Sequence, residues 1–234
     1  MHNKLLTIIV LVFNEAKTIL QALDEVVKID IDKEIIVIDN CSTDGTGDLL
    51  RKNIHPQIKL VFQSKNLGPG GSLQKGASLA TGKYTHFFHA DLEYKAHDVH
   101  KMLEKAESEN LDAVFGSRLA LYSNKSWFYI LKKRPFFFAS LVSTKLINRW
   151  YGHKLTDIIA TKLIRTDVLR SLNCQTLNQG AEFELASKLC KRGYKVAEVP
   201  ISYSPRTYKE GKKIKIWDAI PAMVALYKVK ILDK

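Results

Sequence analysis

The chain has 234 residues, enough to bury one substantial hydrophobic core, and its 46% hydrophobic and 26% charged residues are typical of a folded globular protein. The formal net charge of +12 predicts an anionic partner, which could be nucleic acid, an anionic membrane or a phosphorylated substrate. The three cysteines are far apart and in no metal-binding spacing. We therefore expect a reducing compartment, and neither a disulfide framework nor a cysteine zinc site.

In the first half, short apolar runs alternate with amphipathic stretches of helical length. Strands are predicted at 5–13, 34–39, 58–63, 84–89 and 113–116, and helices at 16–27, 43–52, 71–80 and 96–108. The run 5–13 is shorter than the about 20 residues that cross a bilayer, so we interpret it as a strand and not as a leader. Strands separated by helices predict one Rossmann-like α/β domain over residues 1–234, with a mostly parallel sheet and helices on both faces.

The second half is less regular and strongly basic. Helices are predicted at 135–151, 179–192 and 214–232, and a strand at 194–203. Residues 118–154 hold eight Lys or Arg, nine Phe, Tyr or Trp, and no Asp or Glu. Aromatics among cations favour docking in lipid headgroups, so the basic amphipathic helix 214–232 either packs on the core or lies on a membrane.

Polar residues collect directly after the predicted strands, where ligands of parallel sheets bind. These segments are Asn14-Glu15, Asp39–Thr46, Asn66–Gly71 and His89–Glu93. A carboxylate there can bind a nucleobase or ribose, and glycines let the backbone approach a phosphate. Two structural alternatives stay open: Ser42 or Thr43 as the N-cap of the next helix, and a plain loop at Gly68–Gly71.

His89, Asp91 and Glu93 are spaced i, i+2 and i+4, which places side chains of an extended segment on one face. One imidazole and two carboxylates would suit Mn²⁺ or Mg²⁺. A solvated, metal-free strand end is the alternative.

Taken in order, these motifs resemble the inverting family 2 glycosyltransferases of GT-A fold, and most of all the dolichyl- or polyprenyl-phosphate sugar synthases. The resemblance rests on Val12–Glu15, Asp39–Thr46, Asn66–Gly68, His89–Asp91, Gly116–Arg118, Glu182–Glu184 with Lys188, Glu198–Ile201, Arg206 and Glu210–Lys213.

The resemblance implies a nucleotide-sugar half, 1–117, and an acceptor and membrane-facing half, 118–234. It implies that the donor is bound by Phe13, Asn14, Glu15, Asp39, Asn40, Ser42, Asn66, Gly68, Ala90, Asp91, Arg206 and Lys212. Asp91 would hold the metal that bridges the diphosphate, and Arg206 would neutralise the leaving group. Arg118, Arg134 and Ser140 would bind the acceptor phosphate.

Three positions depart from the family pattern. His89 stands where an Asp is usual, which would alter metal preference or its pH dependence. Asn40 replaces a second common Asp, and the turn at 157–162 lacks its usual Gly or Cys. The acceptor side is therefore less well predicted than the donor side.

The leading hypothesis is metal-dependent transfer of a hexosyl group from a UDP- or GDP-sugar to a polyprenyl phosphate, dolichyl or undecaprenyl, by a peripheral enzyme at the cytoplasmic membrane face. A phosphate acceptor is already anionic and needs no base. The alternative acceptor, a glycan hydroxyl, requires one, with Asp157 and Glu182 as candidates and Glu184 either a third or paired with Lys188. Nucleic-acid binding is disfavoured because no such motif appears. A fourth hypothesis, suggested by His89, is that the chain is a metal-deficient, non-catalytic member of the family that serves as a partner subunit.

Overall fold

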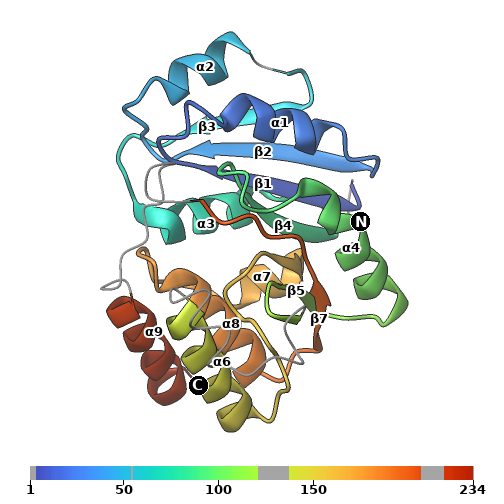
Figure 1. Ribbon diagram of the computed structural model, residues 1–234, viewed down its shortest axis with the longest axis vertical. Coiled ribbons are helices and arrows are strands. Elements are labelled where there is room, and N and C mark those ends of the chain that lie inside the picture. The colour runs from blue at the N-terminus through green and yellow to red at the C-terminus, as the bar shows by residue number, and fades with distance from the viewer. Residues whose placement is uncertain (1–3, 54, 121–136, 207–218, 234) are drawn as a thin grey trace.

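The computed structural model describes residues 4–53, 55–120, 137–206 and 219–233, which build a seven-stranded sheet with helices on both faces (Figure 1). Its strands are β1 (Leu6–Val12), β2 (Lys33–Asp39), β3 (Ile58–Phe62), β4 (Tyr84–His89), β5 (Ala113–Ser117), β6 (Lys162–Arg165) and β7 (Val196–Pro200). Their order across the sheet is β3-β2-β1-β4-β6-β5-β7. Neighbours pair in parallel except that β6 runs antiparallel to both β4 and β5. The predicted mostly parallel α/β domain is confirmed.

The helices form a layer on each face of the sheet. They are α1 (Ile19–Val27), α2 (Thr46–Lys52), α3 (Gly68–Leu79), the 3₁₀ turn η1 (Ala96–Asp98), α4 (Val99–Ser108), α6 (Phe138–Tyr151), α7 (Thr166–Ser171), α8 (Ala181–Lys191) and α9 (Ala219–Leu232). Buried side chains of α1, α2 and α4 pack on one face, and those of α3 and α6 to α9 on the other. None of the helices in the described ranges is long and apolar enough to cross a membrane.

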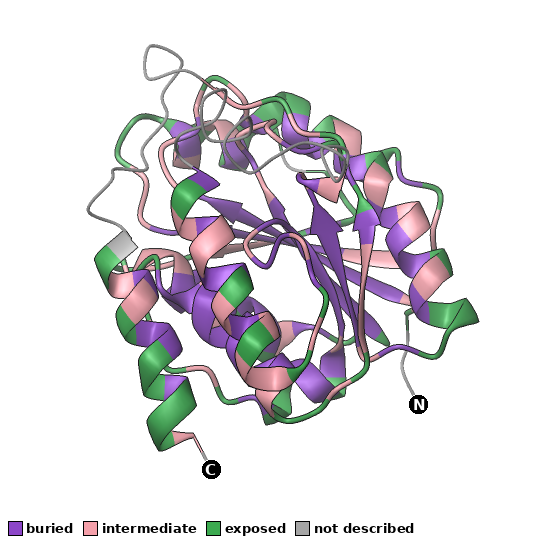
Figure 2. Ribbon diagram, turned by 60° about the horizontal axis from the view of Figure 1, so that its bottom comes forward, coloured by how far each residue is buried: buried purple, intermediate pink, exposed green. Residues whose placement is uncertain are grey.

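The first half folds as its pattern predicts. All seven residues of β1 are buried because the strand lies between β2 and β4 with helices above and below it (Figure 2). A strand that is covered on both faces has a continuous run of apolar residues. This is why Leu6–Val12 could be predicted as a strand although its residues do not alternate between apolar and polar. The parallel strands β1 to β4 bring their carboxyl ends to one edge of the sheet.

Three elements of the second half differ from the prediction. Strand β6 and helix α7 were not expected, because Lys162–Arg165 is short and carries a charge at each end. Helix α9 is not amphipathic. Its inward side holds Ala222, Ala225, Leu226 and Val229, while Ile220, Val224, Tyr227 and Ile231 are exposed on the other side.

Candidate active site

The polar segments after β1, β2 and β3 form one hydrogen-bonded network at the carboxyl edge of the sheet. The backbone N–H of Asn14 donates to Ser42 Oγ at 2.8 Å, and Ser42 Oγ donates to Asp39 Oδ1 at 2.5 Å. Asn40 Nδ2 donates to Asn66 Oδ1 at 2.9 Å. Asn14 has φ 53°, a left-handed conformation that asparagine tolerates. The strand ends thus bring together the predicted donor-binding residues of three loops.

The turn before α2 is closed by Asp44 and not by Ser42 or Thr43. Asp44 Oδ1 accepts bonds from the N–H of Thr46 at 3.0 Å and from its hydroxyl. Gly45 precedes the helix with φ 91°, which glycine adopts without steric cost. The structural alternative, in which Ser42 or Thr43 caps this helix, is therefore wrong. Ser42 instead turns back to Asp39.

The glycines after β3 are used for packing. A Cβ atom on Gly68 would collide with the carbonyl oxygen of Leu177, and one on Gly70 with that of Thr176. The N–H of Gly70 donates to Leu177 O at 2.8 Å. The segment before α8 therefore packs directly against the backbone of Gly68 and Gly70, at the start of α3. Nucleotide binding by Gly68 remains a prediction.

The segment after β4 is not extended, which corrects the expected metal geometry. Leu92 has φ 59°, and the N–H of Glu93 donates to Asp91 Oδ1 at 3.1 Å, so the chain turns between the two acids. The i, i+2, i+4 alternation consequently ends at His89. Over the described ranges, no three His, Cys, Asp or Glu side chains are grouped to hold a metal ion. The predicted three-ligand grouping of His89, Asp91 and Glu93 is wrong.

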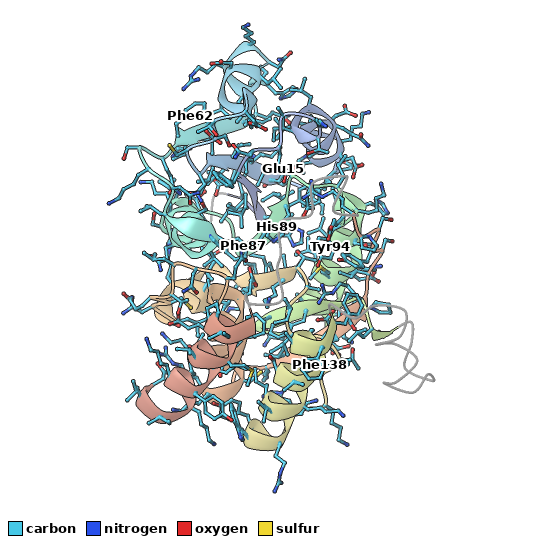
Figure 3. The ribbon with its side chains drawn as sticks, turned by 60° about the vertical axis from the view of Figure 1, so that its left-hand side comes forward. Glu15, Phe62, Phe87, His89, Tyr94 and Phe138 are labelled. Carbon is cyan, nitrogen blue, oxygen red and sulfur yellow. The ribbon has the colours of Figure 1, made fainter. Side chains whose placement is uncertain are left out.

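Arg206 instead joins these acids to the first loop, in the region where Figure 3 labels Glu15 and His89. Its Nη1 and Nη2 atoms donate to the two Glu15 oxygens at 2.8 and 3.2 Å, and Nη2 lies 3.5 Å from Asp91 Oδ2. Its backbone N–H donates to Glu93 Oε1 at 2.9 Å. Three carboxylates from β1 and β4 loops therefore surround one guanidinium contributed by the segment after β7.

Burial dominates the electrostatics of this cluster. Burial and the neighbouring Glu93 raise the pKa of Asp91, against the opposing influence of His89 and Arg206. Burial disfavours the charged guanidinium, but Glu15, Asp91 and Glu93 together raise the pKa of Arg206. Three carboxyl groups face one guanidinium, so acidic side chains outnumber cationic ones in the cluster.

A second buried cluster surrounds Arg118, just after β5. Its Nε and Nη2 atoms donate to the two oxygens of Asp157 at 2.6 and 2.9 Å, and Ser140 Oγ donates to Asp157 Oδ1 at 2.8 Å. Burial opposes ionisation, but Arg118 and Ser140 outweigh it and lower the pKa of Asp157. The guanidinium carbon also lies 4.7 Å from the centre of the Phe137 ring. Arg118 and Ser140, predicted together, do meet.

The candidate bases Asp157 and Glu182 both have cationic partners. Asp157 is completely buried, with both oxygens bonded to Arg118. Glu182 Oε2 lies 2.5 Å from Nζ of Lys162, which is buried in β6. Glu184 pairs with Lys188 at 2.8 Å, as expected if Glu184 has a structural role and not a catalytic one. A direct catalytic role for Asp157 or Glu182 stays a prediction.

Of the remaining predicted site residues, Phe13 and Ala90 lie at the carboxyl edge of the sheet. Phe13 follows β1, and Ala90 is buried after β4, its N–H donating to Leu11 O at 3.3 Å. Arg134 and Lys212 lie outside the described residues. Sequence reasoning missed Tyr203, whose hydroxyl donates to Glu93 Oε2 at 2.9 Å. Its only signal was its place at the end of the predicted strand 194–203, three residues before Arg206.

Loops at the carboxyl edge of a parallel sheet, where these acidic and polar residues gather, are where enzymes of this architecture bind their ligands. The profile of the family described as glycosyl transferase family 2 matches residues 7–172. The chain belongs to this family, and the protein is a glycosyltransferase.

Solved structures share the fold over almost the whole chain. Glucosyl-3-phosphoglycerate synthase from Mycobacterium tuberculosis, in complex with UDP, has a TM-score of 0.69 at 16% identity, covering 97% of this chain and 80% of that one. The same enzyme is known with Mn²⁺, UDP-glucose and phosphoglyceric acid, with a TM-score of 0.68. Mannosyltransferase PcManGT from Pyrobaculum calidifontis, with GDP-Man and Mn²⁺, has a TM-score of 0.64 at 17% identity, covering 100% and 77%. At such identities the likeness shows the fold alone.

Sequence relatives extend the comparison. The uncharacterized protein MJ0544 of Methanocaldococcus jannaschii is 28% identical over 81% of this chain and 84% of its own. Cholesterol galactosyltransferase of Borreliella burgdorferi is 32% identical over 48% of this chain, which spans only 32% of that protein.

Proposed function

We propose that the protein transfers a hexosyl group from a UDP- or GDP-sugar, with inversion, to a polyprenyl phosphate. The observation that carries this proposal is Arg206, which reaches from the second half of the chain into the Glu15, Asp91 and Glu93 cluster of the first half. A cation fixed at the carboxyl edge of the sheet suits a departing nucleoside diphosphate, where negative charge develops. Residues 1–117 would then bind the donor, and residues 118–234 the acceptor.

The donor loops match a nucleotide in chemistry. Asp39 and Asn40 are each 4% exposed. Ser42 of the same loop donates two hydrogen bonds to Asp39, and the N–H of Leu67 donates to Asn40 Oδ1, so both side chains are preorganised for a base or ribose. Likeness to folds solved with UDP, UDP-glucose or GDP-Man supports a nucleotide sugar as the donor.

A divalent cation, Mn²⁺ or Mg²⁺, fits the excess of acidic side chains around Arg206. Asp91 has the most exposed carboxylate of the three, with 22% of its side chain accessible against 10% for Glu15 and 12% for Glu93. We infer that Asp91 and the adjacent His89 hold the ion, because carboxylate and imidazole ligands suit Mn²⁺. Glu93 is engaged by Tyr203 and Arg206 and is a weaker candidate. Bound there, the ion would neutralise diphosphate charge.

A phosphate acceptor is favoured over a hydroxyl by the state of the candidate bases. Asp157 is buried and bonded on both oxygens, and Glu182 is neutralised by Lys162. Neither is arranged to take a proton, whereas a phosphate monoester arrives as an anion. Arg118, with Ser140 beside it, would bind an anionic acceptor by sharing its guanidinium between that anion and Asp157.

A lipid acceptor implies work at a membrane surface, and we propose a peripheral position at its cytoplasmic face. Helix α9 supports this because large apolar side chains are exposed on its outer side, with Ile220 58% and Ile231 73% accessible. The helix carries Lys228 and Lys230 and no acid, so its charge complements anionic lipids. Lys230 Nζ lies 5.6 Å from the Trp150 ring of α6, an aromatic side chain suited to the interface.

The test is a transfer assay with purified protein, Mn²⁺ or Mg²⁺, a panel of UDP- and GDP-sugars and farnesyl phosphate as a water-soluble prenyl phosphate. We expect a glycosyl prenyl phosphate from at least one donor, with the anomeric configuration inverted. A glycan product formed without any lipid phosphate, and lost in Asp157→Asn or Glu182→Gln, would instead establish the hydroxyl acceptor. No donor turnover with either acceptor would refute the proposal.

A further inference from the structure

Tyr203 lies between the two arginines on which the proposed function depends. Its segment is fixed to the β4 loop by a bridge between Tyr94 and Tyr203 and by the N–H of Ser204, which donates to Glu93 O at 2.9 Å. On one side its ring centre lies 5.3 Å from the guanidinium carbon of Arg118. On the other, its hydroxyl holds Glu93 Oε2. One side chain therefore contacts both halves of the site.

The Glu93 carboxylate can compete with a bound diphosphate for the guanidinium of Arg206. Its Oε1 atom accepts the backbone N–H of Arg206 but stays 3.9 Å from the guanidinium Nε. That Nε is buried and has no hydrogen-bond partner among the described residues. A buried N–H of this kind strongly favours any acceptor that reaches it. The Tyr203 hydroxyl, by holding Oε2, keeps the Glu93 carboxylate from closing on Arg206.

We propose that Tyr203 is a positioning residue that couples the acceptor-anion site at Arg118 to the diphosphate site at Arg206. An anion that draws Arg118 forward changes the contact with the Tyr203 ring, and the ring carries the hydroxyl that restrains Glu93. Since a hydrogen bond weakens steeply with distance and angle, a small ring movement changes how strongly Glu93 competes for Arg206. Coupling of this kind is reciprocal, so each ligand changes the affinity of the other by the same factor. The inference rests on the proposed function.

The experiment is calorimetric titration of UDP and GDP, in Mn²⁺, with and without farnesyl phosphate. In the unmodified protein we expect each ligand to change the affinity of the other by about fivefold or more, a typical coupling between sites. Tyr203→Phe keeps the ring and removes the hydroxyl. It should bind farnesyl phosphate within about twofold of normal, bind the nucleotide about five- to tenfold more weakly, and show no coupling.

Two further variants separate positioning from a merely structural effect. Tyr94→Phe removes the hydroxyl of the adjacent ring, whose centre lies 5.3 Å from that of Tyr203, and should keep both affinities and the coupling. Adding Glu93→Gln to Tyr203→Phe removes the competing charge and should restore nucleotide affinity. A general loss of packing would not be reversed in this way.

The outcomes distinguish the two proposals. If the unmodified protein binds no nucleoside diphosphate, the proposed function fails and this inference falls with it. If both ligands bind and Tyr203→Phe retains the coupling, the inference alone is overturned. It is also overturned if that variant weakens farnesyl phosphate as much as nucleotide, or if Glu93→Gln restores nothing.

Discussion

The two halves of this glycosyltransferase are organised by different interactions. In residues 6–117 the site is built from loops that follow parallel strands, and its bonds join neighbouring loops, as between Asn14 and Ser42 or Asn40 and Asn66. In residues 118–120 and 137–206 charged side chains are buried and matched with partners on other elements, as in Arg118 with Asp157 and Lys162 with Glu182. The first half depends on strand order, and the second on pairing of buried charge. Mutations should therefore affect function in the first and stability in the second.

The largest expected effect is on stability, from Asp157→Ala. This change leaves the Arg118 guanidinium buried without its counter-charge, which we expect to lower the free energy of unfolding by about 3–5 kcal/mol. Chemical denaturation measures it. Adding Arg118→Met should recover much of the loss, since no charge then remains buried. Asp48→Ala, which breaks an exposed pair with Arg51, is the matched control and should change little. A small loss in Asp157→Ala would contradict the view that buried charge organises this half.

Arg206 is an exception to the division between the halves, because it belongs to the second and contacts Glu15 and Asp91 of the first. Arg206→Ala should lower kcat/KM by about 10²- to 10³-fold, the usual cost of losing one group that stabilises developing charge. Arg206→Lys should recover part of this, because it keeps the charge but not the two bonds to Glu15. Steady-state kinetics with the best donor is the measurement. Arg165→Ala is the control, because Arg165 lies beside the first residue of β4, at the edge of the sheet away from the site. Near-normal activity in Arg206→Ala would remove the proposal's main support.

His86 gives a pH test at the junction of the halves, where its Nδ1 lies 3.2 Å from Lys162 O across β4 and β6. Burial lowers the pKa of His86 from 6.5 to about 4. The unfolded chain therefore takes up the proton first, and stability falls as pH drops from about 6.5 towards 4. Between pH 7.5 and 5 we expect a loss of about 2 kcal/mol from this group. His86→Gln should flatten that part of the pH profile of unfolding, whereas His55→Gln, on the surface, should not. An unchanged profile in His86→Gln would show that the imidazole is not held neutral.

The smallest effect concerns the outer side of α9. Ile231→Asp should reduce binding to vesicles containing anionic lipid by about tenfold, because it removes an apolar contact and adds a repelled charge. Activity with farnesyl phosphate, which needs no bilayer, should stay normal. Leu20→Asp on α1 tests an exposed apolar residue elsewhere and should leave vesicle binding unchanged. If vesicle binding survives Ile231→Asp, or if that variant instead dissociates an oligomer, α9 does not dock on lipid.

Sequence reasoning failed where a residue's geometry depends on a local turn. The spacing of His89, Asp91 and Glu93 suggested a shared face, but Leu92 takes a left-handed conformation and the alternation stops. The space beside Gly68 and Gly70 is filled by the backbone of residues 176–177, which the sequence did not indicate, while phosphate binding there stays a prediction. In both cases the residue type was informative about tight backbone geometry. It did not indicate which neighbour occupies the space.

The sequence alone determined the strands β1 to β5, the helices between them and the set of polar residues at the strand ends, because apolar periodicity and turn chemistry are local properties of the chain. Only the tertiary structure decided which charges meet. The Glu15–Arg206 and Arg118–Asp157 pairs join residues 191 and 39 positions apart, and no local pattern encodes such a match. Burying a charge is tolerated only with a partner, so the partner is chosen by the packing of distant elements.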